Sequence, residues 1–361
     1  MRQTTAVAGL ALAIELVLSA TARGAPEDPG PFGVTKTAVQ VPVGGGTQLA
    51  TDIYVPQAAG PFPIVVIRHG FTRSKANWVN WGNHLAARGF VALTITSRAP
   101  WSPDPAVDSD DQLAVLAWGV AQNSVSGSPL EGKVDASRRG IGGHSAGGLC
   151  SVVAATKDPT LRAAVFFDEV DVSGTGVGAA PSIAIPSISL FAEPGTCNAQ
   201  ANGVAIFQAI GGPRYGIKIP GSGHCDPEDP SDHLGCGLPC GADAQAQYQL
   251  LYRRYGTAFL EAFLKCDPAA YPYINGATAQ GDPGITIYPE TNIVIPPPAC
   301  SQSDGGTPQD DAGPTDAPAS HDAIDYWDAP AGDVSGQGPD GGGPGPVASG
   351  AGGVGGTGGG A

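Results

Sequence analysis

Apolar residues fall into two patterns along the chain from about residue 35 onward. Some segments are short and continuously apolar, such as residues 63–68 (PIVVIR) and 163–167 (AAVFF), whereas the segment with Trp78, Trp81 and Leu85 places apolar residues on one helical face. Continuous apolar strands separated by helices are typical of a parallel sheet covered on both faces. The sequence therefore predicts an α/β fold with a mostly parallel central sheet and helices on both sides.

The expected elements begin with an antiparallel hairpin, residues 37–43 and 49–55, joined through three glycines. The further strands expected are 63–68, 90–95, one through Ile141, 163–167, 185–192 and 215–219; the helices expected are 78–88, 112–122, 148–155 and 245–264. This series gives one domain, which we place at residues 23–300. Its length is sufficient for a sizeable core.

The two ends of the chain differ from this middle part. Residues 1–22 combine Arg2, an apolar stretch interrupted by Glu15, and an A-x-A site ending at Ala22, the layout of a secretory signal peptide. Residues 301–361 contain nine Asp, many Gly and Pro, and neither Lys nor Arg. Such a segment cannot bury enough apolar surface to fold, so we expect a disordered tail.

The net charge of −15 comes mostly from that tail, which leaves about −6 on the rest. No basic cluster is present in the sequence, which argues against nucleic acid as a partner. We expect a monomer that is secreted, periplasmic or at the cell surface, with no membrane-spanning segment in the mature chain.

Seven cysteines lie in the middle part, and an exported protein is expected to form disulfides. Cys150, within the helix predicted for 148–155, is expected to be a buried free thiol. Among the fifteen pairings of the other six, we favour Cys266 with Cys300. The remaining four are Cys197, Cys225, Cys236 and Cys240.

The sequence Gly-His-Ser-Ala-Gly at 143–147 lies between a predicted strand and a predicted helix. Strand, G-x-S-x-G and helix form the layout of a nucleophile elbow, which holds a serine hydroxyl on a strained turn above a sheet. The flanking glycines avoid steric collisions that a Cβ would cause. Because glycine is abundant in this chain, the motif needs its context, and the context agrees. We predict Ser145 as the nucleophile of a serine hydrolase.

A serine nucleophile needs a histidine base and a carboxylate that orients it. His224 follows the predicted strand 215–219, where the catalytic histidine of such a fold belongs, and we prefer it to His233. An alternative is that these histidines bind zinc with the neighbouring cysteines and aspartates. The spacing fits no closed four-ligand site, so we predict no metal and no cofactor.

Three carboxylates are candidates for the orienting acid. Asp168 follows the strand 163–167 directly and ranks first, Glu193 follows the strand 185–192, and Asp171 ranks third. The expected oxyanion donors are the backbone amides of Ala146 and Phe71. Trp78 and Trp101 are the aromatic candidates for lining an apolar substrate site.

Residues 67–72 (IRHGFT) and 85–92 (LAARGFVA) resemble the N-terminal part of two related groups of α/β hydrolases. One group contains the bacterial cutinases and polyester hydrolases, and the other contains the chlorophyllases. Residues 166–171 (FFDEVD) and 223–226 (GHCD) resemble the chlorophyllase acid and histidine segments, which implies roles for Asp168 and His224. The sequence departs at Gly195, where cutinase-like enzymes keep their acid, and at Glu169, where chlorophyllases have proline. The resemblance covers residues 35–265.

The resemblance implies a serine esterase with the α/β-hydrolase fold, acting on a small lipophilic or polymeric ester through an acyl-enzyme. One alternative is a cutinase or polyester depolymerase. Another, of a different class, is a surface binding module that has kept the hydrolase scaffold and lost catalysis.

Overall fold

The computed structural model describes residues 24–300, which belong to one compact unit. The predicted signal peptide (1–22) and the predicted tail (301–361) lie outside the described residues.

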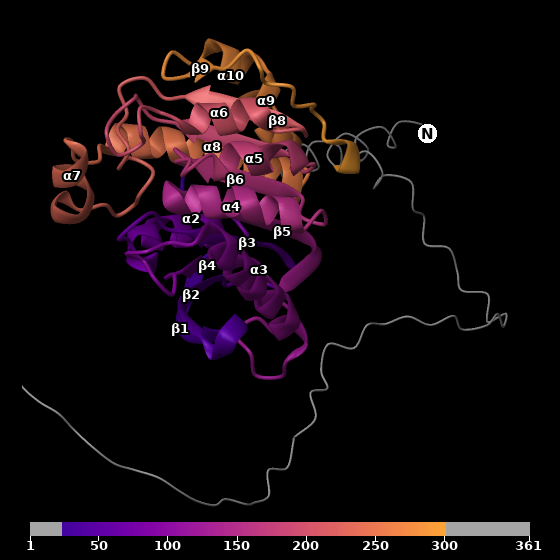
Figure 1. Ribbon diagram of the computed structural model, residues 1–361. Coiled ribbons are helices and arrows are strands. Elements are labelled where there is room, and N and C mark those ends of the chain that lie inside the picture. Colours follow the sequence, from indigo (N-terminus) through magenta and orange to yellow (C-terminus); the bar gives the residue numbers. More distant parts are fainter. Residues whose placement is uncertain (1–23, 301–361) are drawn as a thin grey trace, which may run out of the picture. The chain divides into compact units, whose positions relative to one another are not determined.

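Through this unit runs a sheet whose nine strands lie in the order β1-β2-β4-β3-β5-β6-β7-β8-β9 (Figure 1). The strands from β4 to β8 in this order pair in parallel, whereas β1 with β2, β2 with β4, and β8 with β9 are antiparallel. The strands are β1 Val34–Pro42, β2 Gln48–Pro56, β3 Phe62–Arg68, β4 Val91–Ile95, β5 Val134–His144, β6 Ala163–Phe167, β7 Ser187–Phe191, β8 Arg214–Lys218 and β9 Thr286–Ile287. The mostly parallel sheet and the opening hairpin are as expected.

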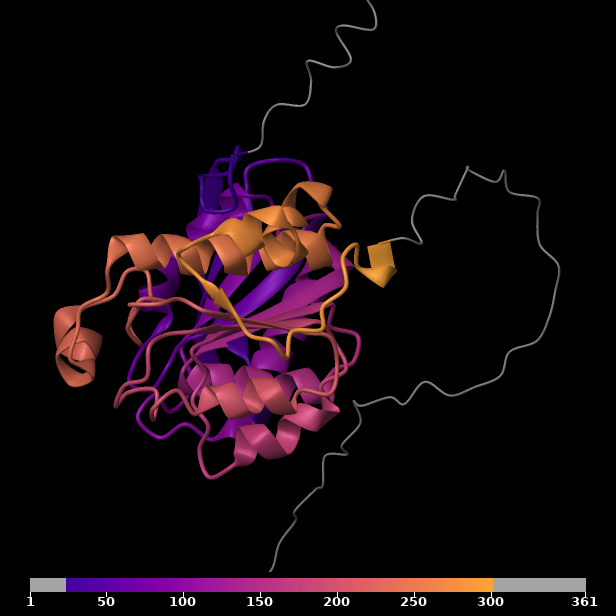
Figure 2. The ribbon, with the colours of Figure 1, turned by 90° about the horizontal axis from the view of Figure 1, so that it is seen from above.

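Helices cover both faces of the sheet, as Figure 2 shows from above. They are α2 Val79–Ala87, α3 Pro105–Ala121, α4 Ala146–Lys157, α5 Thr175–Ala179, α6 Gly203–Ala209, α7 Leu238–Cys240, α8 Ala246–Leu264, α9 Pro272–Asn275 and α10 Ala277–Gly281. Within residues 24–300, none of them combines the length and the apolar character needed to cross a bilayer.

The alternation of side chains along β3 explains the two layers. Val65 and Ile67 belong to the apolar cluster that includes α2 and α8, whereas Ile64 and Val66 belong to the cluster that includes α3 and α4. Successive residues of a strand point to opposite faces, so a continuously apolar strand must be covered on both. Burying each such side chain contributes roughly 1.5–3 kcal/mol.

Several elements extend beyond their predicted bounds or were not predicted, and helix α3 and strand β9 illustrate the reasons. Helix α3 begins at Pro105 instead of residue 112, because the Asp104 carboxylate accepts from the amides of Ala106 and Val107 and proline occupies the first turn. The edge strand β9 has only two residues and no apolar pattern of its own. It exists because it pairs with β8.

The parallel strands end at one edge of the sheet. The segments after Arg68 of β3, His144 of β5, Phe167 of β6 and Lys218 of β8 therefore meet there, although they are far apart in sequence.

Candidate active site

Ser145 lies in the tight turn between β5 and α4. Its backbone has φ 57° and ψ −123°, a strained conformation for a residue with a side chain. A Cβ at Gly143 would lie 2.2 Å from the Gly147 carbonyl oxygen, and one at Gly147 would lie 2.2 Å from the His69 carbonyl oxygen. The glycines therefore allow this turn to pack against β3, and the predicted elbow geometry is present.

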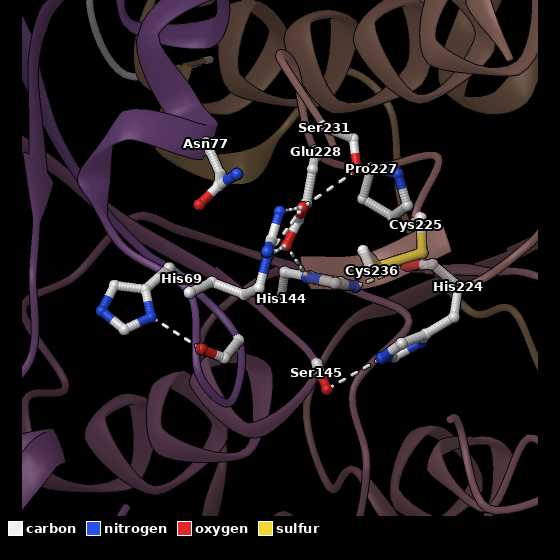
Figure 3. Close-up of polar contacts among 12 residues, drawn as sticks. His69, Asn77, His144, Ser145, His224, Cys225, Pro227, Glu228, Ser231 and Cys236 are labelled. Atoms are coloured by element: carbon white, nitrogen blue, oxygen red, sulfur yellow. Dashed lines mark hydrogen bonds and ion pairs between the residues drawn. A yellow bond between two sulfur atoms is a disulfide. The ribbon is translucent and has the colours of Figure 1, made fainter. Parts of the chain in front are cut away.

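The structure brings Ser145, His224 and Asp168 together (Figure 3 shows the first two). His224 Nε2 lies 2.9 Å from Ser145 Oγ, and His224 Nδ1 lies 2.6 Å from Asp168 Oδ2. With Nδ1–H donating to the carboxylate, Nε2 is free to accept the serine proton. This is the arrangement that activates a serine hydroxyl as a nucleophile.

Asp168 is held in its orientation by several donors. Its φ is 42°, a left-handed conformation that Asp tolerates better than most residues, and its side chain is buried. The Ala192 amide donates to Oδ1 at 3.0 Å, and the Asn198 amide group donates to Oδ2 at 3.1 Å. Asn198 is fixed in turn, because its Oδ1 accepts from the amides of Gly195 and Ala201. These donors compensate the burial of a carboxylate.

The other two acid candidates have partners elsewhere. Glu193 forms an ion pair with Lys218 at 2.6 Å and accepts from the Gly221 amide, and these interactions lower the pKa of Glu193. Asp171 accepts from the amides of Gly176 and Val177 at the start of α5. The structure therefore places Asp168, and neither of these alternatives, against His224.

Glu169, next to Asp168, is buried where the resembling chlorophyllase segment has proline. It accepts a hydrogen bond from the Ser189 hydroxyl at 2.8 Å, and burial raises the pKa of its carboxyl to about 8. A Cβ at Gly148 would lie 2.7 Å from the Glu169 Cβ. The neutral Glu169 side chain thus packs beneath the first turn of α4.

The turn after β3 contacts the elbow. A Cβ at Gly70 would lie only 3.0 Å from the Ser145 Cβ, so Gly70 packs closely against Ser145. Phe71 is the next residue along this turn. His69 fixes this turn: its Nδ1–H donates to the Gly70 carbonyl at 2.7 Å, and its Nε2 accepts from the Ser97 amide at 2.9 Å. Burial lowers the pKa of His69 to about 4, which keeps the imidazole neutral. Phe71 and Ala146 as oxyanion donors remain predictions.

The two tryptophans proposed to line a substrate site have different surroundings. Trp101 is 75% exposed and packs edge-on against Phe71, with ring centroids 6.4 Å apart. The loop that carries it is tied to the turn after β3, because the Thr72 amide donates to the Pro100 carbonyl. Trp78, in contrast, is fully buried against Trp81 and Phe167, so its assignment as a substrate-lining residue was wrong.

All six disulfide candidates are bonded. The pairs are Cys266–Cys300, as expected, together with Cys197–Cys240 and Cys225–Cys236. Cys150 is free and buried, and burial raises the pKa of its thiol to about 12. The sulfurs of Cys225, Cys236 and Cys240 lie within 4.8 Å of one another, but their disulfides occupy the thiolates that the alternative zinc site would use.

Sequence reasoning missed a buried polar group beside His224. The His144 Nε2–H donates to the His224 carbonyl oxygen at 2.8 Å, and Figure 3 shows the His144 ring between Glu228 and His224. Burial first, and the neighbouring His224 second, lower the pKa of His144 well below its usual range. Glu228 is fully buried and forms an ion pair with Arg73. No motif marks these residues, because Arg73 and Glu228 are 155 positions apart.

Comparison with known proteins agrees with the fold. A family model described as PET hydrolase-like matches residues 21–185. The chain has the α/β-hydrolase fold. Among its relatives within that fold are a bis(hydroxyethyl) terephthalate hydrolase of Streptomyces coelicolor, a cutinase of Thermobifida fusca and chlorophyllase-1 of Arabidopsis thaliana.

The identities to these relatives are 34% over 142 residues, 29% over 183 and 27% over 128, respectively. The matches cover 38%, 45% and 34% of this chain and 42%, 57% and 39% of the relatives. The chain thus spans roughly half the length of the curated relatives it matches. The family match ends at residue 185, so Ser145 and Asp168 lie inside it and His224 lies beyond it.

Proposed function

We propose that this protein is an esterase that hydrolyses carboxylic esters through an acyl-enzyme on Ser145. The observation that carries the proposal is the continuous hydrogen-bonded chain from Ser145 through His224 to Asp168. The names of the relatives, which include a terephthalate ester hydrolase, cutinases and a chlorophyllase, support it.

In the proposed reaction, Ser145 Oγ attacks the ester carbonyl carbon while its proton passes to His224 Nε2. Asp168 holds the imidazole in the required tautomer and stabilises the imidazolium that forms. The amides of Ala146 and Phe71 donate to the oxyanion. Collapse of the tetrahedral intermediate breaks the bond to the alcohol, which leaves with the proton from His224. Water then attacks the acyl group by the same route and releases the acid.

Replacing the nucleophile tests the proposal. Ser145→Ala removes the attacking oxygen, so hydrolysis of short p-nitrophenyl esters is expected to fall by at least about 10⁴-fold, while the melting temperature changes little. A fluorophosphonate probe should label the natural protein and leave the variant unlabelled. Turnover that survives in the variant would refute the assignment. A well-folded natural protein that neither reacts with the probe nor turns over esters would favour the binding-module alternative.

A polyester or cutin depolymerase is the second candidate. The observation that favours it is the exposed Phe71–Trp101 pair beside the turn that touches Ser145, because flat aromatic surfaces can hold the aromatic or apolar units of a polymer. Clearing of a polyester emulsion would support this second candidate function. Activity confined to soluble esters would exclude it.

We also propose that the protein is exported and acts as a monomer. Three disulfides within residues 24–300 favour an oxidising compartment. Detection of the mature protein outside the cytoplasm tests the first part, and light scattering of the purified protein tests the second.

A further inference from the structure

One buried ion pair joins the two loops that would supply the base and the oxyanion donor. Arg73 lies two residues after Phe71, and Glu228 lies four residues after His224. The guanidinium binds the carboxylate through two nitrogens: Nε lies 2.8 Å from Oε1, and Nη2 lies 2.7 Å from Oε2. Glu228 is completely buried and Arg73 is 8% exposed. A second carboxylate, that of Asp232, lies 2.6 Å from Nη2.

Further contacts hold the histidine loop, residues 220–232, along the segment that follows Arg73. The Asp229 amide donates to the Asn77 carbonyl at 2.9 Å, and the Asn80 amide donates to the Asp229 carbonyl at 3.0 Å. The Trp81 indole N–H donates to the Pro227 carbonyl at 2.8 Å. The histidine loop is thus docked on the start of α2 as well as on Arg73.

His144 links the ion pair to the proposed base. Its Nε2–H donates to the His224 backbone carbonyl. Its neutral Nδ1 lies 3.7 Å from Glu228 Oε1 without a hydrogen bond, so His144 contacts Glu228 by packing alone. The centroids of the His144 and His224 rings lie 4.6 Å apart. A shift of Glu228 would therefore be transmitted to His224 through His144, and to the turn after β3 through Arg73.

The energetics of buried ion pairs indicate what this one contributes. Desolvation offsets most of the attraction between buried charges, so such a pair adds little to stability compared with an apolar pair of similar volume. A bidentate pair does restrict geometry, because the planar guanidinium and the carboxylate fit in few relative positions. Catalysis is sensitive to displacements of about 1 Å, so a constraint on two loops at once has a direct effect on rate.

We propose that Arg73 and Glu228 are positioning residues, with His144 between them and the base, and that their ion pair sets the separation of the oxyanion turn and the histidine loop. This inference rests on the proposed esterase function. If the pair has this role, breaking it lowers kcat by more than its effect on the stability of the fold would explain.

The test is a double-mutant cycle with Arg73→Gln, Glu228→Gln and the double variant, assayed on a soluble p-nitrophenyl ester. Each single change is expected to lower kcat by about 10- to 100-fold with KM changed by less than about 3-fold, because the loops shift relative to each other. The double variant should be no slower than the slower single variant, since all three changes break the same link. The rate of fluorophosphonate labelling should fall in parallel.

The chain offers a matched control in Arg88 and Glu261. This pair is also buried and bidentate, with Nε 2.9 Å from Oε1 and Nη2 3.0 Å from Oε2. It joins the end of α2 to α8. Both residues border a cleft that Phe62 also lines. Because Phe62 is the first residue of β3, this cleft lies at the edge of the sheet opposite Ser145. Glu261→Gln should lower the melting temperature by about as much as Glu228→Gln while leaving kcat of the folded protein unchanged.

Arg73→Lys provides a second variant if Glu228→Gln does not fold. It keeps the charge but not the two-nitrogen geometry, so kcat should fall several-fold in a protein that is folded by circular dichroism. Unchanged kcat in the folded Arg73 and Glu228 variants, or an equal loss in Glu261→Gln, would overturn the inference. Absence of turnover in the natural protein would overturn the proposed function instead.

Discussion

At the scale of single residues, the carboxylate against His224 comes from the end of β6. Asp168 follows Phe167 directly, whereas Glu193, after β7, is paired with Lys218. The proposed orienting acid therefore follows the strand adjacent to β5, which leads into Ser145, and lies one strand earlier than the alternative at Glu193.

Asp168→Asn should lower kcat on a soluble ester by about 10⁴-fold, because the amide no longer holds the imidazole in the tautomer that accepts a proton at Nε2. Glu193→Gln, the matched control, should lower kcat by less than about 2-fold, since its carboxylate is partly exposed and contacts Lys218. Steady-state kinetics of the two variants checks this. The opposite ranking would assign the orienting acid to Glu193.

The site residues that sequence could predict have a common property. Ser145, His224 and Asp168 each follow a predicted strand, so strand positions made all three of them candidates. Glu193 also follows a predicted strand, so these positions ranked Asp168 first without excluding Glu193. Asn198, Arg73 and Glu228 lie in loops without a recognisable pattern, and only folding brings them to the site. Trp78 was misassigned because an aromatic residue on an apolar helical face has the same sequence signal whether it contacts substrate or core.

At the scale of elements, β3, β4 and β6 were predictable because each is an almost continuously apolar run that is buried along its whole length. The start of α3 depended on the cap at Asp104, and β9 depended on a neighbour, so neither followed from apolar periodicity. The loop after β8 was recognised by His224 alone. Its shape depends on two disulfides and on its contacts with α2.

The disulfide Cys225–Cys236 should matter for activity because Cys225 adjoins His224. Replacing both cysteines by serine is expected to cost about 2–4 kcal/mol of unfolding free energy. It should also lower kcat roughly 10-fold, since the base gains freedom to move. Cys266–Cys300 is the control, because Cys266 borders the cleft at the far edge of the sheet. Its removal should lower the melting temperature without changing kcat of the folded protein. Equal kcat in both double variants would contradict the prediction.

At the scale of the whole molecule, buried titratable groups set how stability depends on pH. Burial lowers the pKa of His69 to about 4 and that of His84 to about 3, from 6.5. Below pH 6.5 the unfolded chain binds protons that the folded protein does not, so stability falls with falling pH. Burial raises the pKa of Glu169 from 4.5 to about 8. Between these values the folded protein holds a proton that the unfolded chain has lost, so this group lowers stability as pH rises.

The sum of these opposing effects predicts maximal stability near pH 6.5. Each group changes the unfolding free energy by about 1.4 kcal/mol per pH unit within its range, and the histidines outweigh the single glutamate on the acid side. Urea unfolding at pH 5, 6.5 and 8 measures the curve. Glu169→Gln should flatten its alkaline side and leave the acid side in place. Stability that still rises from pH 6.5 to 8 would show that Glu169 ionises normally in the folded protein.

The three disulfides all join cysteines from Cys197 onward, after the chain has completed β7. During biosynthesis, the portion that contains the nucleophile can therefore collapse before any sulfur is oxidised, while the segment carrying the imidazole is secured only afterwards. Recombinant material from a reducing cytoplasm would then lack the bond beside His224 and hydrolyse esters roughly 10-fold more slowly than the oxidised protein. Exposure to an oxidant such as glutathione disulfide would restore the faster rate, so the choice of expression host affects how readily a screen detects the proposed activity.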